Sequence, residues 1–461
     1  MTEPLCDLTA IELRNRIARR ELSARDVMAA HLARIERTNP DLNAIVTLVA
    51  ESAMTAAALA DERQARDEPL GLLHGLPVAH KDLFDTRGIR TTYGSPLYAT
   101  QIPAADALIV ERLKAAGAIS VGKTNTPEWG AGSHTFNPVF GATRNPYDRT
   151  KTCGGSSGGS AVALAAGMVP IADGSDMGGS LRNPAAFCNV VGLRPSPGRV
   201  PSWPDRLAGL GLGVPGPMAR TAADTALMLA AIAGPDPRSP IALEAPGSRF
   251  AEPLGRDWHG VRIAWAPRFG GLPYEPEIPA QIEAQRPRFE ALGCVVEEAE
   301  PNVDEADDVF KTLRAWHFAT THHDAWARHK AELKDTVAWN IERGLALSGP
   351  DLGRAELQRT TLYHRVRKFF ERYDFLVLPV TQVMPFDIET EYPREIAGVP
   401  MTTYIDWMKS CYLISATGCP AISVPAGFGP GGHPIGLQIV GRHRDDFGVL
   451  QLAHAFGEAR T

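Results

Sequence analysis

Two hydrophobic patterns divide the chain. Between residues 9 and 67 the apolar positions recur three and four residues apart, which predicts amphipathic helices. The pairs Thr9–Glu12 and Ser23–Asp26 match capping boxes and predict where two of these helices begin, while residues 51–67, rich in alanine, predict a third. From Gly75 onward, short apolar runs bounded by glycine or proline predict buried strands, the first being LPVAH at 76–80.

The rest of the chain alternates between these patterns. We expect helices at 107–117, 279–293, 446–459 and, in several pieces, about 305–373, with a further capping box at Thr221–Asp224 opening another. We expect strands at 118–122, 261–266, 294–299, 375–379, 421–425 and 435–441. Helices that alternate with apolar strands are typical of an α/β protein.

Composition narrows the class of protein. The chain has 461 residues, of which 44% are hydrophobic and 22% charged, as in ordinary globular proteins. The net charge of −6 argues against a nucleic-acid partner, and no apolar run approaches the length of a membrane span. The N-terminus lacks a signal pattern and the six cysteines form no close pair, so we expect a cytoplasmic protein with reduced thiols.

The stretch from Cys153 to Pro195 carries the strongest chemical signal. Two glycine-serine clusters, GGSSGGS and DGSDMGGS, flank the apolar run AVALAAGMVPIA. A nucleophilic hydroxyl beside free backbone N–H groups suits acyl transfer, which needs an oxyanion hole next to the nucleophile. Flexible linkers are the alternative, but the run between the clusters is apolar enough to be core.

Lys81 follows the predicted strand at 76–80. It could be an exposed lysine at a strand end, or one paired with Asp82 or Asp85. Buried beside a serine cluster, it would instead lose its proton more easily and act as a base. The residues alone leave both interpretations open.

Two motifs point elsewhere but lack their structural context. GAISVGKT at 117–124 matches a phosphate-binding loop, yet the predicted strand lies inside the motif, so nucleotide binding by Lys123 and Thr124 is disfavoured. GGSSG at 154–158 matches a nucleophile elbow around Ser156, but a polar, proline-broken segment precedes it where a strand is needed. Four histidines (His317, His322, His323 and His329) lack the HExxH spacing, so we expect surface or pocket-lining histidines and no metal.

Over nearly its whole length the chain resembles the amidase signature family of serine hydrolases. The resemblance rests on the stretch 153–195, on GLPVAHKDLFDTRGIRTTYGS, on VGKTNTPEWGAGSHTFNPVFGATRNP and on CPAISVPAGF followed by IGLQIVG. It implies one domain over residues 1–461, a three-layer α/β/α sandwich around a large mixed sheet. The match is best at 1–235 and 405–461, whereas 236–404 is more variable and is expected to help form the substrate pocket.

The resemblance also implies the catalytic residues. Ser180 corresponds to the nucleophile, Ser156 to a bridging serine after a cis peptide bond, and Lys81 to the base. The oxyanion hole is expected from the backbone N–H groups of Met177, Gly178, Gly179 and Ser180. Supporting roles fall to an Asp176–Arg182 ion pair and to Ser157, the rival for the bridge.

This sequence departs from the family pattern at two positions. Met177 stands where threonine is common, and His80 stands where an aliphatic residue is common. Both departures bear on the substrate. A pocket is expected near the 196–217 loop and the 305–410 region, lined by aromatic residues that could equally be core (Trp129, Phe136, Trp316, Trp339, Tyr404 and Trp407).

The expected activity is hydrolysis of small amides, aryl amides, esters and carbamates, without cofactor, metal, nucleic acid or membrane. A homodimer is one option for the assembly. Three alternatives remain: the glutaminase subunit of a tRNA-dependent amidotransferase, a nucleotide-binding protein, and a scaffold that kept the motif without turnover.

Overall fold

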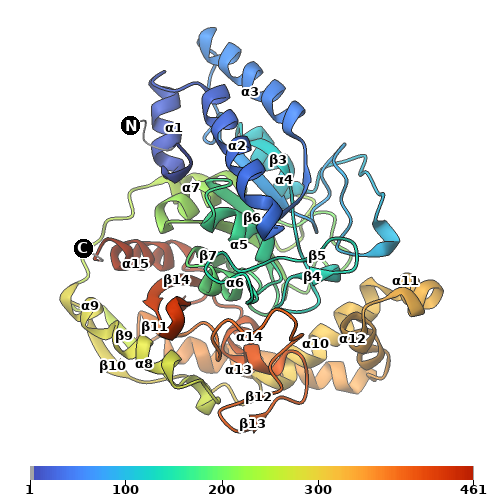
Figure 1. Cartoon of the computed structure of the whole chain (residues 1–461). Helices are drawn as coiled ribbons and strands as arrows, with labels where there is room; N and C mark the ends of the chain where they lie inside the picture. Colours follow the sequence, from blue (N-terminus) through green and yellow to red (C-terminus); the bar gives the residue numbers. More distant parts are fainter. Residues whose placement is uncertain (1–4, 460–461) are drawn as a thin grey trace.

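A mixed sheet of eleven strands forms the centre of the molecule (Figure 1). The computed structural model describes residues 5–459, so the first four residues of the stretch searched for a signal pattern lie outside it. In space the strands follow the order β1-β3-β2-β6-β8-β7-β14-β15-β11-β9-β10. The strands are β1 (Ile45–Leu48), β2 (Pro77–Lys81), β3 (Ile119–Thr124), β6 (Ile171–Asp176), β7 (Val191–Arg194), β8 (Val214–Ala219), β9 (Arg262–Trp265), β10 (Val295–Glu298), β11 (Phe375–Pro379), β14 (Ala421–Phe428) and β15 (Pro434–Gly441).

Helices cover both faces of this sheet, and two short hairpins lie outside it. The helices are α1 (Ala10–Ala18), α2 (Ala24–Leu42), α3 (Ala50–Ala65), α4 (Leu108–Ala115), α5 (Gly158–Ala165), α6 (Arg182–Phe187), α7 (Ala222–Ile232), α8 (Glu277–Glu283), α9 (Arg286–Ala291), α10 (Ala306–Thr321), α11 (His323–His329), α12 (Asp335–Leu345), α13 (Gly349–Phe369), α14 (Lys409–Thr417) and α15 (Asp446–Glu458). The hairpins are β4 (Phe136–Asn137) with β5 (Gly141–Ala142), and β12 (Glu395–Ile396) with β13 (Val399–Pro400).

Alternating residues of β11 face two separate cores on opposite sides of the sheet. In β11, Phe375 and Val377 face a core shared with α1, α4, α7, α8, α9 and α15, whereas Leu376 and Leu378 face a core shared with α10, α13 and α14. A third core packs α2, α3 and α5 against the β1 end of the sheet. Successive side chains of a strand point to opposite faces, so a strand that is apolar at every position is buried between two helical layers. The expected three-layer sandwich is therefore confirmed.

Most of the predicted elements are confirmed. The capping boxes at Thr9 and Ser23 are both formed, and the alanine-rich helix is α3. The box at Thr221 is half formed: its hydroxyl accepts from the Asp224 N–H, but the Asp224 carboxylate accepts from the Ile11 N–H at 3.0 Å and so ties α7 to α1.

The helix expected at 279–293 is two helices, α8 and α9. Pro287 stands in the first turn of α9. Proline has no N–H to donate to the preceding turn, so one continuous helix could not keep its hydrogen bonds there.

Strand direction brings the serine-rich stretch next to Lys81. Strands β2 and β6 are parallel neighbours, with Val78 opposite Ile171. Their carboxyl ends therefore meet at one edge of the sheet, where Lys81 ends β2 and Asp176 ends β6. Ligands of α/β proteins commonly bind outside the carboxyl ends of such strands.

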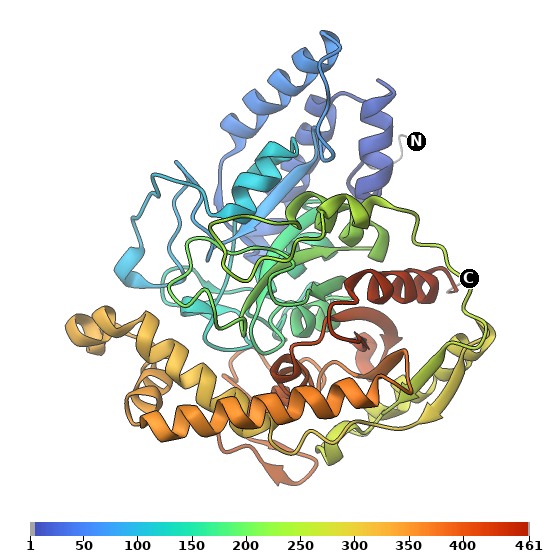
Figure 2. The same ribbon diagram turned by 180° about the vertical axis from the view of Figure 1, so that it is seen from behind.

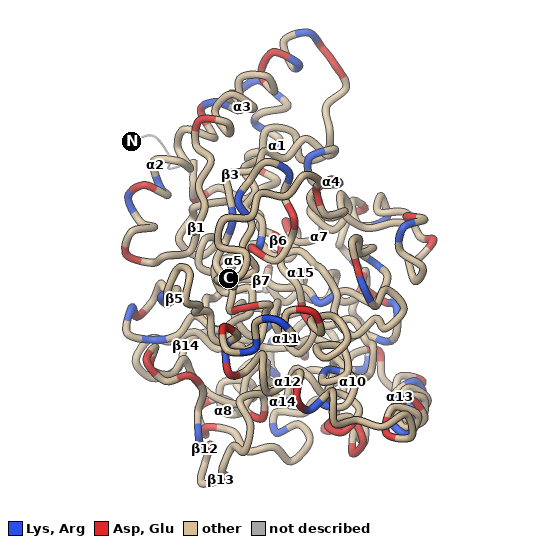
Figure 3. The backbone as a smooth tube through the Cα atoms, turned by 90° about the vertical axis from the view of Figure 1, so that its right-hand side faces the viewer, with Lys and Arg blue, Asp and Glu red and all other residues tan. Residues whose placement is uncertain are grey.

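The outer helices carry the charged surface. Figure 2 shows α13 lying across the outside of the half that contains α10 and α12. Helix α13 carries residues of both signs, and its last two turns are basic, with Arg365, Arg367 and Lys368 (Figure 3). Among residues 5–459, no helix is both long and apolar enough to cross a membrane.

The two-sided core predicts a large difference between two leucine substitutions. Leu378→Ala should destabilise the protein by about 2–5 kcal/mol, because the buried side chain of Leu378 leaves a cavity. Leu357→Ala, at a position 73% exposed, serves as the control and should change the stability by less than about 0.5 kcal/mol. Urea unfolding followed by circular dichroism measures both, and equal costs would contradict the assignment of Leu378 to the core.

Candidate active site

The Lys81 side chain is fully buried and surrounded by hydroxyl groups. Its Nζ lies 2.8 Å from Ser156 Oγ, 2.9 Å from Ser157 Oγ and 3.1 Å from Ser175 Oγ. It forms no ion pair with Asp82 or Asp85: Asp82 accepts from Thr92, and Asp85 accepts from Tyr93. The buried alternative for Lys81 is therefore confirmed.

Burial shifts Lys81 toward its neutral form. Loss of solvation lowers the pKa of Lys81 to about 7, although the negative charges of Asp176 and Asp173 act in the opposite direction. A buried ammonium group without a carboxylate in contact loses its proton more easily than one in water. Near neutral pH, a large share of Lys81 can therefore accept a proton.

The neighbouring strand β6 fixes the Lys81 backbone through the Asp173 carboxylate. The Lys81 N–H donates to Asp173 Oδ1 at 2.6 Å, and the other oxygen of Asp173 lies 2.6 Å from His80 Nδ1. His80 Nε2 in turn lies 2.7 Å from Ser120 Oγ. His80 thus replaces the usual aliphatic residue with a polar chain that fixes Asp173 and the end of β2.

Ser156 and Ser157 precede α5, which packs on β2 and β6. The peptide bond between Gly155 and Ser156 is cis, as the resemblance implies. Ser157 is the N-cap of α5, but its hydroxyl caps no helical N–H and instead contacts Lys81 and the Ser175 backbone. Both serines therefore contact the lysine, and the contacts alone do not separate the bridge from its rival.

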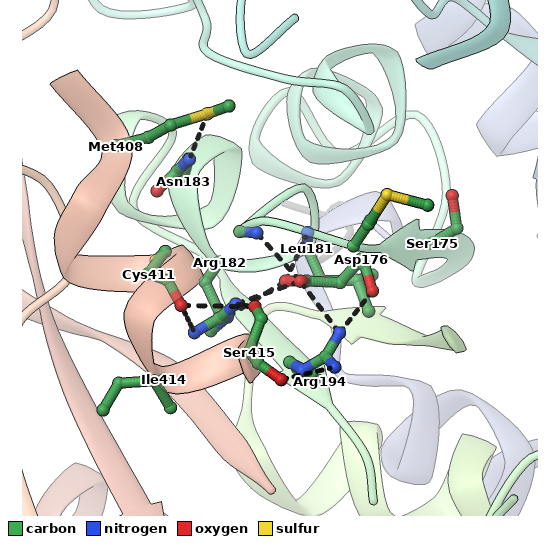
Figure 4. A network of polar contacts seen from close by, with 12 residues as sticks. Ser175, Asp176, Leu181, Arg182, Asn183, Arg194, Met408, Cys411, Ile414 and Ser415 are labelled. Atoms are coloured by element: carbon green, nitrogen blue, oxygen red, sulfur yellow. Dashed lines mark hydrogen bonds and ion pairs between the residues drawn. The ribbon is translucent and has the colours of Figure 1, made fainter. Parts of the chain in front are cut away.

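The loop after β6 is anchored by one carboxylate (Figure 4). Asp176 forms an ion pair with Arg182 at 3.0 Å and another with Arg194 at 3.3 Å, and all three side chains are fully buried. It also accepts from the N–H groups of Gly179, at 2.8 Å, and Leu181, at 3.2 Å. Burial opposes the charge of Asp176, but the two guanidinium groups outweigh it and hold its pKa well below the usual range.

These contacts distinguish Gly179 from the other residues expected to form the oxyanion hole, which stays a prediction. The Gly179 N–H points at Asp176 and so already has a partner. The N–H groups of Met177, Gly178 and Ser180 have no hydrogen-bond acceptor among residues 5–459. The Gly179 N–H thus helps to hold the loop, and the φ of +115° at Gly179 favours glycine at this position.

Ser180 lines a cavity of about 420 Å³. Ser156, Ser175 and Met177 line the same cavity. The Ser180 carbonyl accepts from the Ser157 N–H at 3.1 Å, which ties the two serine clusters together. Within the described part of the chain, the Ser180 hydroxyl forms no hydrogen bond with Ser156, and such catalytic contacts often tighten only when substrate binds.

Two segments form the upper walls of this cavity. The 196–217 loop contributes residues from Pro201 to Pro215, as expected. Helix α10 contributes Arg314, Phe318 and Thr321, which recur on one helical face. Trp129 also lines the cavity and stacks on His322, at the end of α10, with a centroid distance of 4.1 Å.

The other expected pocket aromatics do not line this cavity. Trp316 lies two residues from Arg314, on another face of α10, and packs against the adjacent core. Tyr404 is buried behind Arg314, whose guanidinium donates to its hydroxyl at 2.7 Å. Phe136 belongs to β4, where the Lys334 ammonium lies 3.8 Å from its ring centroid.

Trp407 is buried in the core of the same half, and Trp339 is a partly buried residue that packs against that core. Trp339 meets the Tyr404 ring edge-on at 5.6 Å, and Trp407 packs against Phe187 and Phe386. Of the six aromatic residues expected at the pocket, Trp129 alone lies on the wall of this cavity.

The motifs at 117–124 and 154–158, which resemble a phosphate-binding loop and a nucleophile elbow, do not have the structures that those functions need. Lys123 and Thr124 are buried in β3, where Thr124 Oγ1 lies 2.7 Å from Ser160 Oγ and Lys123 Nζ donates to the Phe84 carbonyl. A phosphate-binding loop would present these groups to solvent, so a nucleotide site here is excluded. No strand leads into Ser156, although α5 follows it, so the nucleophile-elbow interpretation also fails.

The sequence did not reveal the roles of Ser175 and Arg194. Ser175 was visible within DGSDMGGS, but only the pairing of β2 with β6 places it against Lys81. Arg194 lies 18 residues beyond Asp176, and no local pattern connects the two.

The histidines are spread over the end of α10 and over α11. His317 and His322 line the cavity, and His323 and His329 are exposed. Within residues 5–459, no group of three or more His, Cys, Asp or Glu side chains is arranged to hold a metal ion.

The buried anchor predicts a large loss of stability when its charge is removed. Asp176→Asn should cost about 3–5 kcal/mol, because it leaves the Arg182 and Arg194 charges buried without a counter-ion. Glu371→Gln breaks only an exposed pair with Arg367 and should change the stability little. Urea midpoints of the two variants measure the difference, and a midpoint for Asp176→Asn near that of the unmodified protein would refute the anchor.

Comparisons with known proteins identify the family of the chain. The chain matches the sequence profile of the family described as Amidase over residues 26–450. It is 36% identical to an acylamidase of Rhodococcus erythropolis (98% of this chain, 95% of that protein) and 33% identical to a glutamyl-tRNA(Gln) amidotransferase subunit of Methylococcus capsulatus (98% and 96%). It superposes on a bacterial aryl acylamidase of the amidase signature family with a TM-score of 0.92 at 30% identity (99% and 97%). The chain therefore belongs to the amidase signature family, whose enzymes act on C–N bonds.

Proposed function

We propose that the protein hydrolyses carboxylic amides through Lys81, Ser156 and Ser180. The observation that carries this proposal is the buried Lys81 ammonium, whose pKa is lowered to about 7 and whose Nζ lies 2.8 Å from Ser156 Oγ. A serine hydroxyl is a weak nucleophile until a base within hydrogen-bond reach takes its proton. Lys81 is such a base: it is fully buried, and its hydrogen-bond partner Ser156 lines the same cavity as Ser180.

The proton moves through Ser156. Neutral Lys81 takes the hydroxyl proton of Ser156, Ser156 takes that of Ser180, and the Ser180 oxygen forms a bond to the amide carbon. The C–N bond then breaks, and the proton returns through Ser156 to the leaving nitrogen. Water attacks the acyl-enzyme by the same route and releases the acid, which restores all three residues.

The loop after β6 supplies the oxyanion hole. We assign the donors to the N–H groups of Met177, Gly178 and Ser180, because the Gly179 N–H is held by Asp176 at 2.8 Å. Donors fixed in place before the reaction stabilise the developing negative charge without reorganising. The Arg182 and Arg194 pairs with Asp176 keep the loop in that shape.

The cavity favours small aryl amides among the possible substrates. Its volume is about 420 Å³, and Trp129, Phe318 and Tyr93 contribute rings to its walls. The similar proteins named an acylamidase and an aryl acylamidase support the same class. Esters and carbamates present a carbonyl that the same nucleophile can attack, so we include them as secondary substrates.

One other function has a specific observation in its favour. The glutamyl-tRNA(Gln) amidotransferase subunit of M. capsulatus is 33% identical over 98% of this chain. The second candidate is therefore glutamine hydrolysis that supplies ammonia to a partner protein. Glutaminase activity that appears only with a copurifying partner would favour it, whereas anilide turnover by the protein alone would favour the first.

The mechanism predicts which serines matter. With an aliphatic amide, an anilide, a p-nitrophenyl ester, an aryl carbamate and glutamine as substrates, the anilide should be turned over. Ser180→Ala, Lys81→Ala and Ser156→Ala should each lower kcat by about a hundredfold or more, because each interrupts proton or acyl transfer. Steady-state assays measure the losses.

Ser157→Ala and Ser175→Ala are the matched controls. Both hydroxyl groups contact Lys81, but neither lies on the proposed proton path, so their losses should be much smaller. A fluorophosphonate probe should label Ser180 and leave Ser180→Ala unlabelled. A loss in Ser157→Ala larger than that in Ser156→Ala would assign the bridge to Ser157 instead, and full turnover by Ser180→Ala would place the nucleophile elsewhere.

The pKa of Lys81 predicts the pH profile. Only the neutral amine can act as the base, so kcat/KM should rise with pH, reach half its maximum near pH 7 and level off above it. Below pH 6 the rate should fall about tenfold per pH unit, as the protonated form dominates. An uncharged anilide, assayed from pH 5 to pH 9, avoids titration of the substrate. A profile that stays flat down to pH 5 is incompatible with Lys81 as the base.

A further inference from the structure

Arg314 is a buried cation on the wall of the cavity. It belongs to α10, its exposed fraction is 4%, and it lines the same cavity as Ser180. Its hydrogen bonds go to neutral groups: Nε donates to Asn340 Oδ1, Nη2 to the Tyr404 hydroxyl and Nη1 to the Met177 sulfur. Within residues 5–459, no carboxylate lies within 4.0 Å of its guanidinium.

Other buried arginines of this chain are neutralised. Arg182 and Arg194 share Asp176, and Arg199 contacts Asp446 at 3.0 Å. A buried charge without a counter-ion is costly, because neutral partners replace only part of its hydration. Arg314 recovers some of this cost from the Phe318 ring, whose centroid is 4.7 Å from its guanidinium carbon. An anionic ligand group would recover more.

The partners of Arg314 hold it in one position. Asn340 donates to the Thr336 carbonyl at 2.6 Å and to the Tyr404 hydroxyl at 2.5 Å, and both Asn340 and Tyr404 are buried. A guanidinium fixed before binding loses little side-chain entropy when a ligand arrives. The planar fork of arginine also fits the two oxygens of a carboxylate.

The contact with Met177 places this cation beside the reaction centre. The Arg314 Nη1 lies 3.3 Å from Met177 Sδ, and Met177 is the first residue of the oxyanion loop. A thioether is a weak acceptor on a flexible, here partly exposed, side chain, so a carboxylate can take its place. The ligand group would then lie within a few bonds of the carbonyl under attack.

His317 is a second polar residue on the wall of this cavity. It lies one turn along α10, and its buried Nδ1 has no hydrogen-bond partner among residues 5–459. Burial and the neighbouring Arg314 charge lower the pKa of His317 to about 4, so near neutral pH the ring is uncharged and can donate one hydrogen bond.

We infer that Arg314, with His317 beside it, forms a subsite for a carboxylate that the amide substrate carries a few bonds from its scissile carbonyl. The inference rests on the proposed amide hydrolysis and narrows its substrate class to acidic amides. The carboxylate could belong to the acyl half or to the amine half of the substrate. A carboxylate in either position can bind the guanidinium, and pairs of acidic and neutral substrates distinguish the two positions.

Two substrate pairs test the subsite. Succinanilic acid against butyranilide places the acid on the acyl half, and 4-acetamidobenzoate against acetanilide places it on the amine half. In one pair the protein should prefer the acid, and Arg314→Gln should lower that ratio of kcat/KM values by about 10- to 100-fold, the loss expected for hydrogen bonds to a charged group. Arg314→Lys keeps the charge and should keep part of the preference.

The ratio within each variant cancels any general loss of activity. Arg343→Gln on α12 removes one exposed positive charge outside the cavity and should leave the ratio unchanged. An unmodified protein that prefers the neutral member of both pairs would overturn the inference, as would ratios that are equal in the unmodified protein and in Arg314→Gln.

Binding separates the subsite from the reaction. Calorimetric titration of Ser180→Ala with succinanilic acid and 4-acetamidobenzoate, and with their neutral counterparts, requires no turnover. Tighter binding of an acid that disappears in Ser180→Ala/Arg314→Gln supports the subsite even if no anilide is hydrolysed, an outcome that would count only against the proposed function. Equal binding of acid and neutral ligand in both pairs would overturn the subsite.

Discussion

The Asp176 carboxylate holds the reaction centre together. It ends β6, binds guanidinium groups from α6 and β7, and accepts backbone N–H groups on either side of Ser180. Arg182 extends this network to the Cys411 carbonyl and the Gln438 side chain, so α14 and β15 are connected to the same loop. A buried charge of this kind contributes less to net stability than to fixing one arrangement, because desolvation offsets much of its attraction. Here that arrangement is the shape of the loop that presents Ser180.

Lys81 depends on the sheet in a different way. Parallel pairing of β2 with β6 places it against Ser175, and α5 brings Ser156 and Ser157 from the helical layer above. The result is an ammonium surrounded by hydroxyl groups, with carboxylates close enough to oppose the fall in its pKa but not in contact. A direct ion pair would keep the lysine charged and remove the base.

Local signals predicted much of the fold, and distant contacts account for the rest. The capping boxes at Thr9 and Ser23 are complete within four residues, so sequence alone is sufficient to locate them. The roles of Asp224, Ser175 and Arg194 depend on contacts with residues far away in the chain. A single sequence does not show which distant residues lie close together in space. The pocket aromatics were misplaced for the same reason: composition shows that Trp316 is large and apolar, but only the orientation of α10 decides which neighbours it meets.

Because of that orientation, different segments of the chain contribute different kinds of residues to the cavity. The glycine-serine loops, set by the sheet, contribute the serines of the proposed mechanism, whereas α10 contributes Arg314 and Phe318. Asn340 and Tyr404 are the side chains that fix Arg314. In the described structure neither forms a hydrogen bond with Lys81, Ser156 or Ser180. Substitutions on α10 and α12 can therefore change which group of the proposed substrate is recognised without moving Lys81, Ser156 or Ser180. A fold arranged in this way can keep one reaction while its substrates diverge.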